Sequence, residues 1–458
     1  GTAQFTMADG SISPVTDNDI DLGTASLKYK SFFAGLVDSE NFKVNGGQGS
    51  DGQVLTSTGS GVAWETASGG PTFKTFGTSS IMVGDDATGT IDAADYNTGL
   101  GVDIFAALTS GDYNSVLGFS AGNDITTGHS NTIIGADAGA KITTGAYNTA
   151  VGRASLDACT TADSNTAVGW TSLGLTTTGA GNTAVGSDAG AAITTGANNV
   201  IMGYLAGDAN TTGHRNTYIG TSAGSSSTTV GENTFVGNQA GQSTTTGGIN
   251  TFVGHQAGEA NTTGSSNIFV GSNAGGANTT AAGNTAIGAT AADANTTGSA
   301  LTAVGFGALG AHTTGDSNAG IGYLAGRDVT TGSDNFFAGR SAGQTHTTGT
   351  RSIAIGSFAG GGTGAKTGSN NTSVGYIAGA KITSGAANVA IGDSAGTEIT
   401  EASNSTCVGE QAGSGITTGS NNICLGRGAA TTTTTGTQNI VIGTGANTGH
   451  SGSVGRIV

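Results

Sequence analysis

Six histidines and three cysteines are the side chains best suited to metal binding or nucleophilic chemistry in this chain. His312 and His346 occupy the same position of a 17-residue repeat and lie two repeats apart. If the repeats stack at the spacing of neighbouring strands, about 4.8 Å, the two rings are about 10 Å apart. A shared ion would need bonds of about 2 Å to each ring. The spacing therefore predicts no metal site, and we expect no cofactor.

Cys407 and Cys424 also share one repeat position, on neighbouring repeats. Stacking would put their Cα atoms about 4.8 Å apart, which lies inside the disulfide range. Two interpretations are open: a disulfide, or two small apolar side chains in a packed face. We favour free thiols, because parallel neighbours in register rarely meet the torsion angles that a disulfide requires.

Catalytic patterns are weak in this sequence. Asp85 and Asp86 are a weak calcium candidate, and most other acidic residues fall at variable repeat positions, as is typical of a solvated surface. No Ser/His/Asp order, paired-carboxylate motif or phosphate loop stands out, and GxG strings carry no information among 85 glycines. A glycan depolymerase would need carboxylates clustered on adjacent repeats. We expect that the chain is not an enzyme.

Pairs of threonines recur at positions 13 and 14 of most repeats. Thr favours strands and caps turns through its hydroxyl, so a ladder that supports a corner is the simpler interpretation. The alternative is an ice-binding array of ordered hydroxyls, which would require the ladder to be flat and exposed. Examples of these pairs are Thr126-Thr127, Thr143-Thr144, Thr194-Thr195 and Thr211-Thr212.

Composition excludes several classes of protein. Of 458 residues 85 are Gly, but no Gly recurs at every third position and only 2 are Pro, so the chain is not collagen. A net charge of −16 argues against a nucleic-acid partner, because phosphate binding needs clustered Lys and Arg. No run of 18 apolar residues is present, so we expect no membrane span.

The repeat itself is the strongest signal in the sequence. From Ser80 to Gly455 the chain can be written as 22 lines of 17 residues, one of them two residues longer, with the consensus N-T-A-V-G-x-x-A-G-x-x-x-T-T-G-x-x. We number these positions 1 to 17. Position 1 is Asn in 18 of the 22 lines, position 4 is aliphatic and position 5 is always Gly.

A 17-residue period is too short for a helical hairpin and suits two short strands with two corners. We therefore predict an all-β fold: a parallel β-solenoid, or β-roll, of about 22 coils, with stacked Asn side chains forming a ladder. Glycines at position 5 supply corners, where a positive φ is tolerated only without a Cβ. The corner glycines singled out are Gly135, Gly186, Gly237, Gly288 and Gly392.

Alternation along the strand predicts two faces. We expect the aliphatic side chains of position 4 to form the core, represented by Val83, Ile134, Val185, Val236, Val253, Ile287 and Ile442. Position 3 then points outward, although it is often large and apolar, so we expect it to pack against other chains. The proposed interchain face comprises Ile133, Ile201, Tyr218, Phe235, Phe252, Phe269 and Phe337.

The motif NTAVGxxAG resembles the NSVAIGxxSxA coils of trimeric autotransporter adhesin heads, and it is similar to Gly- and Asn-rich coils of marine phage tail fibres. The resemblance covers residues 80 to 455 and implies a left-handed β-roll that exists only as a trimer. Adhesin coils are typically shorter, so the resemblance carries the fold better than the biology.

Residues 1–70 do not follow the repeat, residues 71–79 read as a linker, and residues 80–458 form the predicted shaft. The segments from Ile12 to Gly35 and from Gly49 to Ala67 resemble small β-structured units of phage tail-fibre proteins. The matching residues are Asp17, Asn18, Asp21, Leu22, Gly23, Lys28, Tyr29, Lys30, Gly52, Gln53, Val54, Leu55, Thr56 and Trp64. A small β-rich knob is expected from Ile20, Leu22, Leu27, Phe32, Phe33, Leu36, Phe42 and Val44.

Together these features predict a structural fibre, a phage tail fibre that links a virion to a host surface, located on the virion or outside the cell. Its expected partners are two further copies of itself, a host-surface glycan or protein receptor, and other virion or appendage proteins at the N-terminal end. The alternative is a bacterial surface adhesin or an extracellular filament subunit.

Overall fold

The computed structural model describes residues 5–8, 11–14, 43–44, 47–48, 53–57, 62–66, 72–76, 80–84 and 93–458. The chain divides into two compact units, Gly1–Gly70 and Pro71–Val458, at the boundary expected from the sequence. The described strands of the first unit form three antiparallel pairs: β1 (Phe5–Ala8) with β2 (Ser11–Pro14), β3 (Lys43–Val44) with β4 (Gly47–Gln48), and β5 (Gln53–Ser57) with β6 (Val62–Thr66).

The GQVLTS…W unit forms the hairpin of β5 and β6, in which Leu55 lies opposite Trp64. The segment from Asp17 to Lys30 lies outside the described residues, as do Asp85 and Asp86. Of the residues expected in a small knob, Val44 lies in β3 and the others fall outside the described part of the chain.

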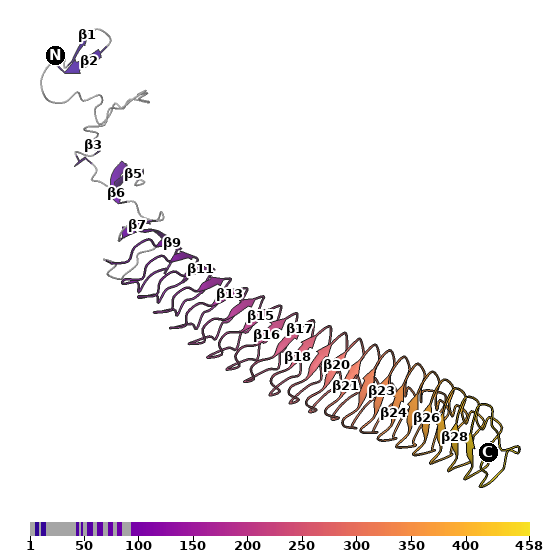
Figure 1. The fold of residues 1–458 in the computed structure, drawn as a ribbon. Helices are drawn as coiled ribbons and strands as arrows, with labels where there is room; N and C mark the ends of the chain where they lie inside the picture. The colour runs from indigo at the N-terminus through magenta and orange to yellow at the C-terminus, as the bar shows by residue number, and fades with distance from the viewer. Residues whose placement is uncertain are drawn as a thin grey trace. The chain divides into compact units, whose positions relative to one another are not determined.

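The second unit is a parallel β-solenoid of about 21 turns of roughly 17 residues, without a helix among the described residues (Figure 1). β7 (Thr72–Phe76), within the expected linker, pairs antiparallel with β8 (Ser80–Gly84). Each later coil contributes one strand, in register with the next. These strands are β9 (Thr98–Gly101), β10 (Ser115–Leu117), β11 (Thr132–Ile134), β12 (Thr149–Val151), β13 (Thr166–Val168), β14 (Thr183–Val185), β15 (Val200–Met202), β16 (Thr217–Ile219), β17 (Thr234–Val236), β18 (Thr251–Val253), β19 (Ile268–Val270), β20 (Thr285–Ile287), β21 (Thr302–Val304), β22 (Ala319–Ile321), β23 (Phe336–Ala338), β24 (Ile353–Ile355), β25 (Thr372–Val374), β26 (Val389–Ile391), β27 (Thr406–Val408), β28 (Ile423–Leu425) and β29 (Ile440–Ile442).

The expectation of two strands per coil is wrong, because each coil from β10 onward has a single strand, of three residues. After β17, positive φ values recur at Gly237 (142°), Gln239 (57°) and Gly241 (58°), and they wind the chain too tightly for a second extended segment. The backbone still bonds from coil to coil there. The N–H of Gly241 donates to the carbonyl of Ala257 at 2.9 Å, so hydrogen bonds stack along the turns as well as along the sheet.

Corner glycines at position 5 are confirmed. Gly237 has a φ of 142°, and a Cβ there would lie 2.3 Å from the carbonyl oxygen of Gly254 in the next coil. Any side chain would therefore push two coils apart, so the repeat requires Gly at this corner. The same geometry, with φ between 131° and 142°, holds for Gly135, Gly186, Gly237, Gly288 and Gly392.

The assignment of the two strand faces is wrong. Position 3 points into the coil: Ile133, Ile201, Tyr218, Phe235, Phe252, Phe269 and Phe337 are at most 1% exposed, so they cannot form an interchain face. Position 4 points outward, and the expected core residues Val83, Ile134, Val185, Val236, Val253, Ile287 and Ile442 are half-buried or exposed.

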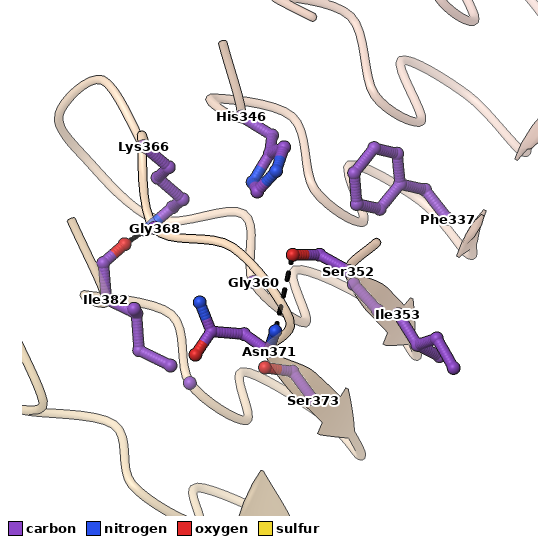
Figure 2. Close-up of a pocket in the computed structure, with 12 residues that line it drawn as sticks. Phe337, His346, Ser352, Ile353, Gly360, Lys366, Gly368, Asn371, Ser373 and Ile382 are labelled. Atoms are coloured by element: carbon purple, nitrogen blue, oxygen red, sulfur yellow. Dashed lines mark hydrogen bonds between the residues drawn. The ribbon is translucent and has the colours of Figure 1, made fainter. Parts of the chain in front are cut away.

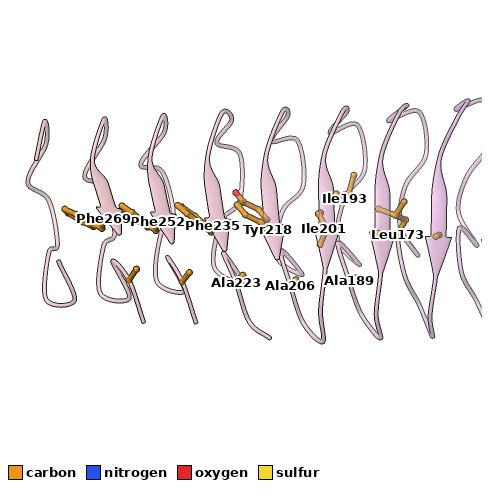
Figure 3. Close-up of a cluster of buried hydrophobic side chains, with 14 of the residues drawn as sticks. Leu173, Ala189, Ile193, Ile201, Ala206, Tyr218, Ala223, Phe235, Phe252 and Phe269 are labelled. Atoms are coloured by element: carbon orange, nitrogen blue, oxygen red, sulfur yellow. The ribbon is translucent and has the colours of Figure 1, made fainter. Parts of the chain in front are cut away.

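The coil interior accommodates large rings because the facing turn is built from small residues. Ala240 at position 8 is fully buried, and a Cβ on Gly241 would lie 2.7 Å from the ring of Phe235. The rings of Phe235, Phe252 and Phe269 stack in this space with centroids 4.8 Å apart (Figure 3). Alternation along the strand was predictable, but the space left by Ala and Gly decides which face is inside.

The predicted asparagine ladder is confirmed. The N–H of Asn250 donates to Oδ1 of Asn233 at 2.9 Å, and Nδ2 of Asn250 donates to the carbonyl of Gly264 at 2.9 Å. Each buried amide thus joins its own coil to the preceding one and satisfies a corner carbonyl. At position 13 the Thr245 hydroxyl donates to the carbonyl of Thr262 at 3.1 Å, so this threonine column supports the corner. The position-14 column, such as Thr246, is exposed.

Candidate assembly face

The outward side of the solenoid sheet carries a continuous column of aliphatic side chains at position 4. Ile134, Met202, Ile287 and Leu425 are 39%, 41%, 40% and 45% exposed. The column runs from Leu100 in β9 to Ile442 in β29, because the parallel register puts each position-4 side chain beside the next. We call positions 2 and 4 of β9 to β29 the sheet face.

The sheet face has no charged side chain at position 2 or 4 between Thr98 and Ile442, although the chain carries a net charge of −16. Position 2 is most often Thr, such as Thr234 and Thr251, and is replaced by Val, Ile or Phe in several coils. The strands β9 to β29 contain no charged residue, so the charges of these coils lie in the turns. This segregation keeps one side of the rod apolar and leaves the remaining surface hydrated.

The size of the sheet face exceeds what a hydrated monomer usually leaves exposed. At about 4.8 Å per strand, the column from β9 to β29 is roughly 100 Å long. With a width of about 10 Å its area is on the order of 1,000 Å², whereas the largest apolar patch of a typical monomer is about 300–600 Å². The area also reaches the roughly 800 Å² per partner of a standard protein interface.

Aromatic residues at position 6 extend this surface at the corner that ends each strand. Six of them are half exposed, and the rings of Phe306 and Tyr323 stack with centroids 5.6 Å apart. Tyr and Trp are enriched at protein interfaces because they combine a large apolar area with a polar end. The six are Phe119, Trp170, Tyr204, Phe306, Tyr323 and Tyr376.

The coil with two extra residues replaces the apolar interior with a buried lysine, which the sequence analysis did not identify. Lys366 is 3% exposed, and its Nζ donates to the carbonyl of Ala380 at 2.6 Å. It also donates to the carbonyl of Ile382 at 2.8 Å (Figure 2). His346 lies beside it, and a cavity of about 20 Å³ remains between them and Ser373. In the sequence, only the inserted TGAK segment marks this coil as different from the others.

Burial shifts the pKa of the ionisable groups inside the solenoid. It lowers the pKa of Lys366 to about 8 and that of His346 to about 4, because the charged forms lose their hydration. The pKa of His312 is also lowered to about 4 by burial. His312 is nevertheless well bonded, with Nδ1 3.1 Å from Oδ1 of Asn295 and Nε2 3.1 Å from Nδ2 of Asn318.

Cys407 and Cys424 lie directly opposite each other in β27 and β28, as the repeat predicted. Both are fully buried free cysteines at position 3, inside the coil. A hydrogen bond from Cys424, together with burial, raises the pKa of the Cys407 thiol. Cys407 therefore remains protonated, and both side chains act as small core residues.

Three aspartates from neighbouring coils, Asp157, Asp188 and Asp208, line a hollow of about 420 Å³, which is the arrangement of carboxylates that bears on an enzyme. Burial raises the pKa of Asp208, and the charge of Asp188 adds to the shift. The hydroxyls of Thr171 and Ser187 hydrogen-bond to Asp188, so the surrounding turns already engage this carboxylate. In the described part of the chain, no three His, Cys, Asp or Glu side chains form a candidate metal cluster.

No described helix is long and apolar enough to cross a membrane. Comparison with family models, curated proteins and solved structures finds no match to this chain.

Proposed function

We propose that the chain forms the shaft of a homotrimeric fibre, a virion appendage of the phage tail-fibre type that links a particle to a host surface. The observation that carries this proposal is the sheet face, an uncharged aliphatic surface that runs along the whole stack of strands from Leu100 to Ile442.

Another copy of the same chain is the partner best suited to this surface. The ridges of the sheet face repeat once per strand, at about 4.8 Å, and only a partner with the same step can interdigitate along roughly 100 Å. A globular partner would cover only part of it. The resemblance to trimeric adhesin coils supports three copies, with position 4, rather than position 3, packed between chains.

The mechanical role follows from how the coils are joined. Neighbouring coils are joined by backbone hydrogen bonds along the sheet and the turns, and most of them also by the buried ladder of asparagines. Bending such a rod requires many of these bonds to lengthen together, so the stack is stiff. The number of coils sets its reach, and the charged turns keep it hydrated.

The virion role is supported by the N-terminal unit. Its DNDIDLG segment resembles tail-fibre sequences, and its GQVLTS unit forms the hairpin of β5 and β6. Antibodies raised against the shaft should label the ends or tails of phage particles in electron micrographs. Labelling of bacterial surfaces in the absence of particles would instead favour the adhesin alternative.

The assembly itself is tested by the mass of the purified protein in solution. We expect about three times 43.9 kDa by sedimentation or light scattering. The triple variant Val236→Lys, Val253→Lys and Val270→Lys puts charges into the sheet face of three adjacent coils, where burying them between chains is costly. We expect this variant to dissociate into monomers.

The matched control places the same charges on the exposed corner of the same coils, as Thr246→Lys, Thr263→Lys and Thr280→Lys. It should retain the wild-type mass. A monomeric wild type, or a sheet-face variant that remains trimeric, would contradict the proposal. Open-ended polymers would indicate a filament subunit. A monomer that also inhibits ice recrystallisation would favour the exposed threonine columns as an ice-binding surface.

A further inference from the structure

Exposed tyrosines gather at one corner of the first coils, at position 17. Tyr96, Tyr113 and Tyr147 are 48%, 59% and 62% exposed. The rings of Tyr96 and Tyr113 are stacked, with centroids 4.9 Å apart and planes inclined by 5°. Tyr96 therefore supports Tyr113 from one side, and the next side chain in this column beyond Tyr113 is the small Ser130.

A hollow of about 360 Å³ opens where Ser130 interrupts the tyrosine column, between Tyr113 and Tyr147. These two tyrosines are two coils apart, or about 10 Å along the stack. Aromatic contacts place ring centres about 4.5–7 Å apart, so the interval can admit one six-membered ring. We call this site the tyrosine hollow.

Polar groups line the rest of the tyrosine hollow. The carboxylate of Asp112 accepts a hydrogen bond from the backbone N–H of Asp95 at 2.7 Å, which orients it and leaves its second oxygen for another donor. The ring of His129 packs edge-on against Tyr147 with centroids 5.0 Å apart, and its Nδ1 lies 3.3 Å from Oγ of Ser130. Ser110 and Thr127 complete the lining.

We propose that the tyrosine hollow binds a neutral pyranose residue of a glycan. The C–H face of a pyranose packs on an aromatic ring, while its hydroxyls both donate and accept hydrogen bonds, as Asp112, Thr127, Ser130 and His129 require. A phosphate or an acidic sugar would meet the Asp112 carboxylate with no Lys or Arg in the lining. The inference rests on the proposed host-binding role and names the receptor class for that role.

The test uses the full chain on an array of neutral trisaccharides built from glucose, mannose, galactose or N-acetylglucosamine, with polysialic acid as the acidic comparator. We expect at least one neutral trisaccharide to bind. Tyr113→Ala and Tyr147→Ala should each weaken that binding about tenfold, the effect of losing one well-packed aromatic contact. Ile249→Ala is the matched control, because Ile249 occupies position 17 and is 62% exposed, as Tyr147 is.

Binding of polysialic acid alone, no binding of any neutral trisaccharide, or equal binding by wild type and both tyrosine variants would overturn the inference. Failure of the sugar-binding inference can be distinguished from failure of the proposed trimeric shaft. The hollow lies within one chain, so the sheet-face triple lysine variant should still bind sugar as a monomer. The tyrosine variants should keep the wild-type mass, which shows that they fold and assemble.

Discussion

Around Phe252 three aromatic rings stack inside consecutive coils, whereas the coil from Ser352 to Asn370 encloses Ala354 and the side chain of Lys366. Here one apolar cluster ends at Ala359 and the next begins at Ala378. The parallel pairing of β24 with β25 continues across the interruption without a change of register along the strand. Backbone stacking therefore tolerates very different interiors.

The interiors of these two regions are stabilised by different interactions. The aromatic stretch depends on dispersion and apolar burial, which are insensitive to pH. The inserted coil depends on hydrogen bonds from the buried Lys366 ammonium to two carbonyls, and on a histidine whose Nε2 has no partner among the described residues. We therefore expect the inserted coil to be the weaker and more pH-dependent part of the rod.

The largest expected effect is the loss of a ring from the aromatic stretch. Phe252→Ala leaves a cavity between Phe235 and Phe269 that the stacked backbone cannot close, and should cost about 3–5 kcal/mol. Hydrogen exchange of the amides of neighbouring coils measures this loss locally. Ser373→Ala, at position 3 beside the inserted coil, is the matched control and should cost less than about 1 kcal/mol. Equal losses of stability in Phe252→Ala and Ser373→Ala would show that the aromatic stretch does not depend more strongly on apolar packing than the inserted coil does.

Lys366 should make stability rise with pH in the alkaline range. Its pKa is about 8 in the folded chain and 10.5 in the unfolded chain, so the unfolded state binds more protons between these values. The free energy of unfolding should therefore increase by up to about 3 kcal/mol from pH 8 to pH 10.5. The difference between wild type and Lys366→Met, measured by hydrogen exchange and corrected for intrinsic rates, isolates this group. The exposed Lys381→Met is the control, and a wild-type slope in Lys366→Met would contradict the assignment.

The buried histidines should destabilise the rod in acid. The pKa of His312 is about 4 folded and 6.5 unfolded, so the unfolded state binds more protons between these values and stability falls as the pH drops from 6.5 to 4. The expected loss is up to about 3 kcal/mol. His312→Asn should remove the contribution of His312 and leave that of His346, without loss of folding, because Asn261, Asn278 and Asn295 fill the same position in other coils. Denaturant unfolding of wild type and His312→Asn at pH 4.5 and pH 7 measures the loss of stability in acid. An equal loss in both proteins would contradict the role of His312.

The smallest expected effects come from exchanging Ser and Asn at position 1 of the asparagine ladder. Ser352 stands where most coils have Asn, and its hydroxyl accepts the N–H of Asn371 at a long 3.4 Å. Ser352→Asn should add a donor to the corner carbonyl and gain about 1 kcal/mol, whereas Asn250→Ser should lose about as much. Denaturation midpoints of both variants measure the exchange. If both midpoints rise or both fall, Asn at position 1 does not stabilise the inserted coil and the aromatic stretch in the same way.

Much of this molecule was predictable from the spacing of its residues. A 17-residue period, Gly at position 5 and Asn at position 1 predict a parallel stack with tight corners and an amide ladder, because these roles depend on local backbone geometry and on identical neighbours. The in-register contact of Cys407 and Cys424 followed from the same period. The tyrosine hollow was also latent in the repeat, as a column at position 17 interrupted by Ser130.

Only the tertiary structure decided which side of the strand is inside. Alternation distinguishes position 3 from position 4 but does not rank them, since both are apolar. The turn across the coil, with Ala240 and Gly241, leaves room for the ring of Phe235 on one side, and position 4 must then face outward. The burial of Lys366 could not be predicted for the same reason. A lysine in an inserted turn is expected to be solvated, and only the structure shows that the small residues Ala354 and Ser373 leave space for its aliphatic stem.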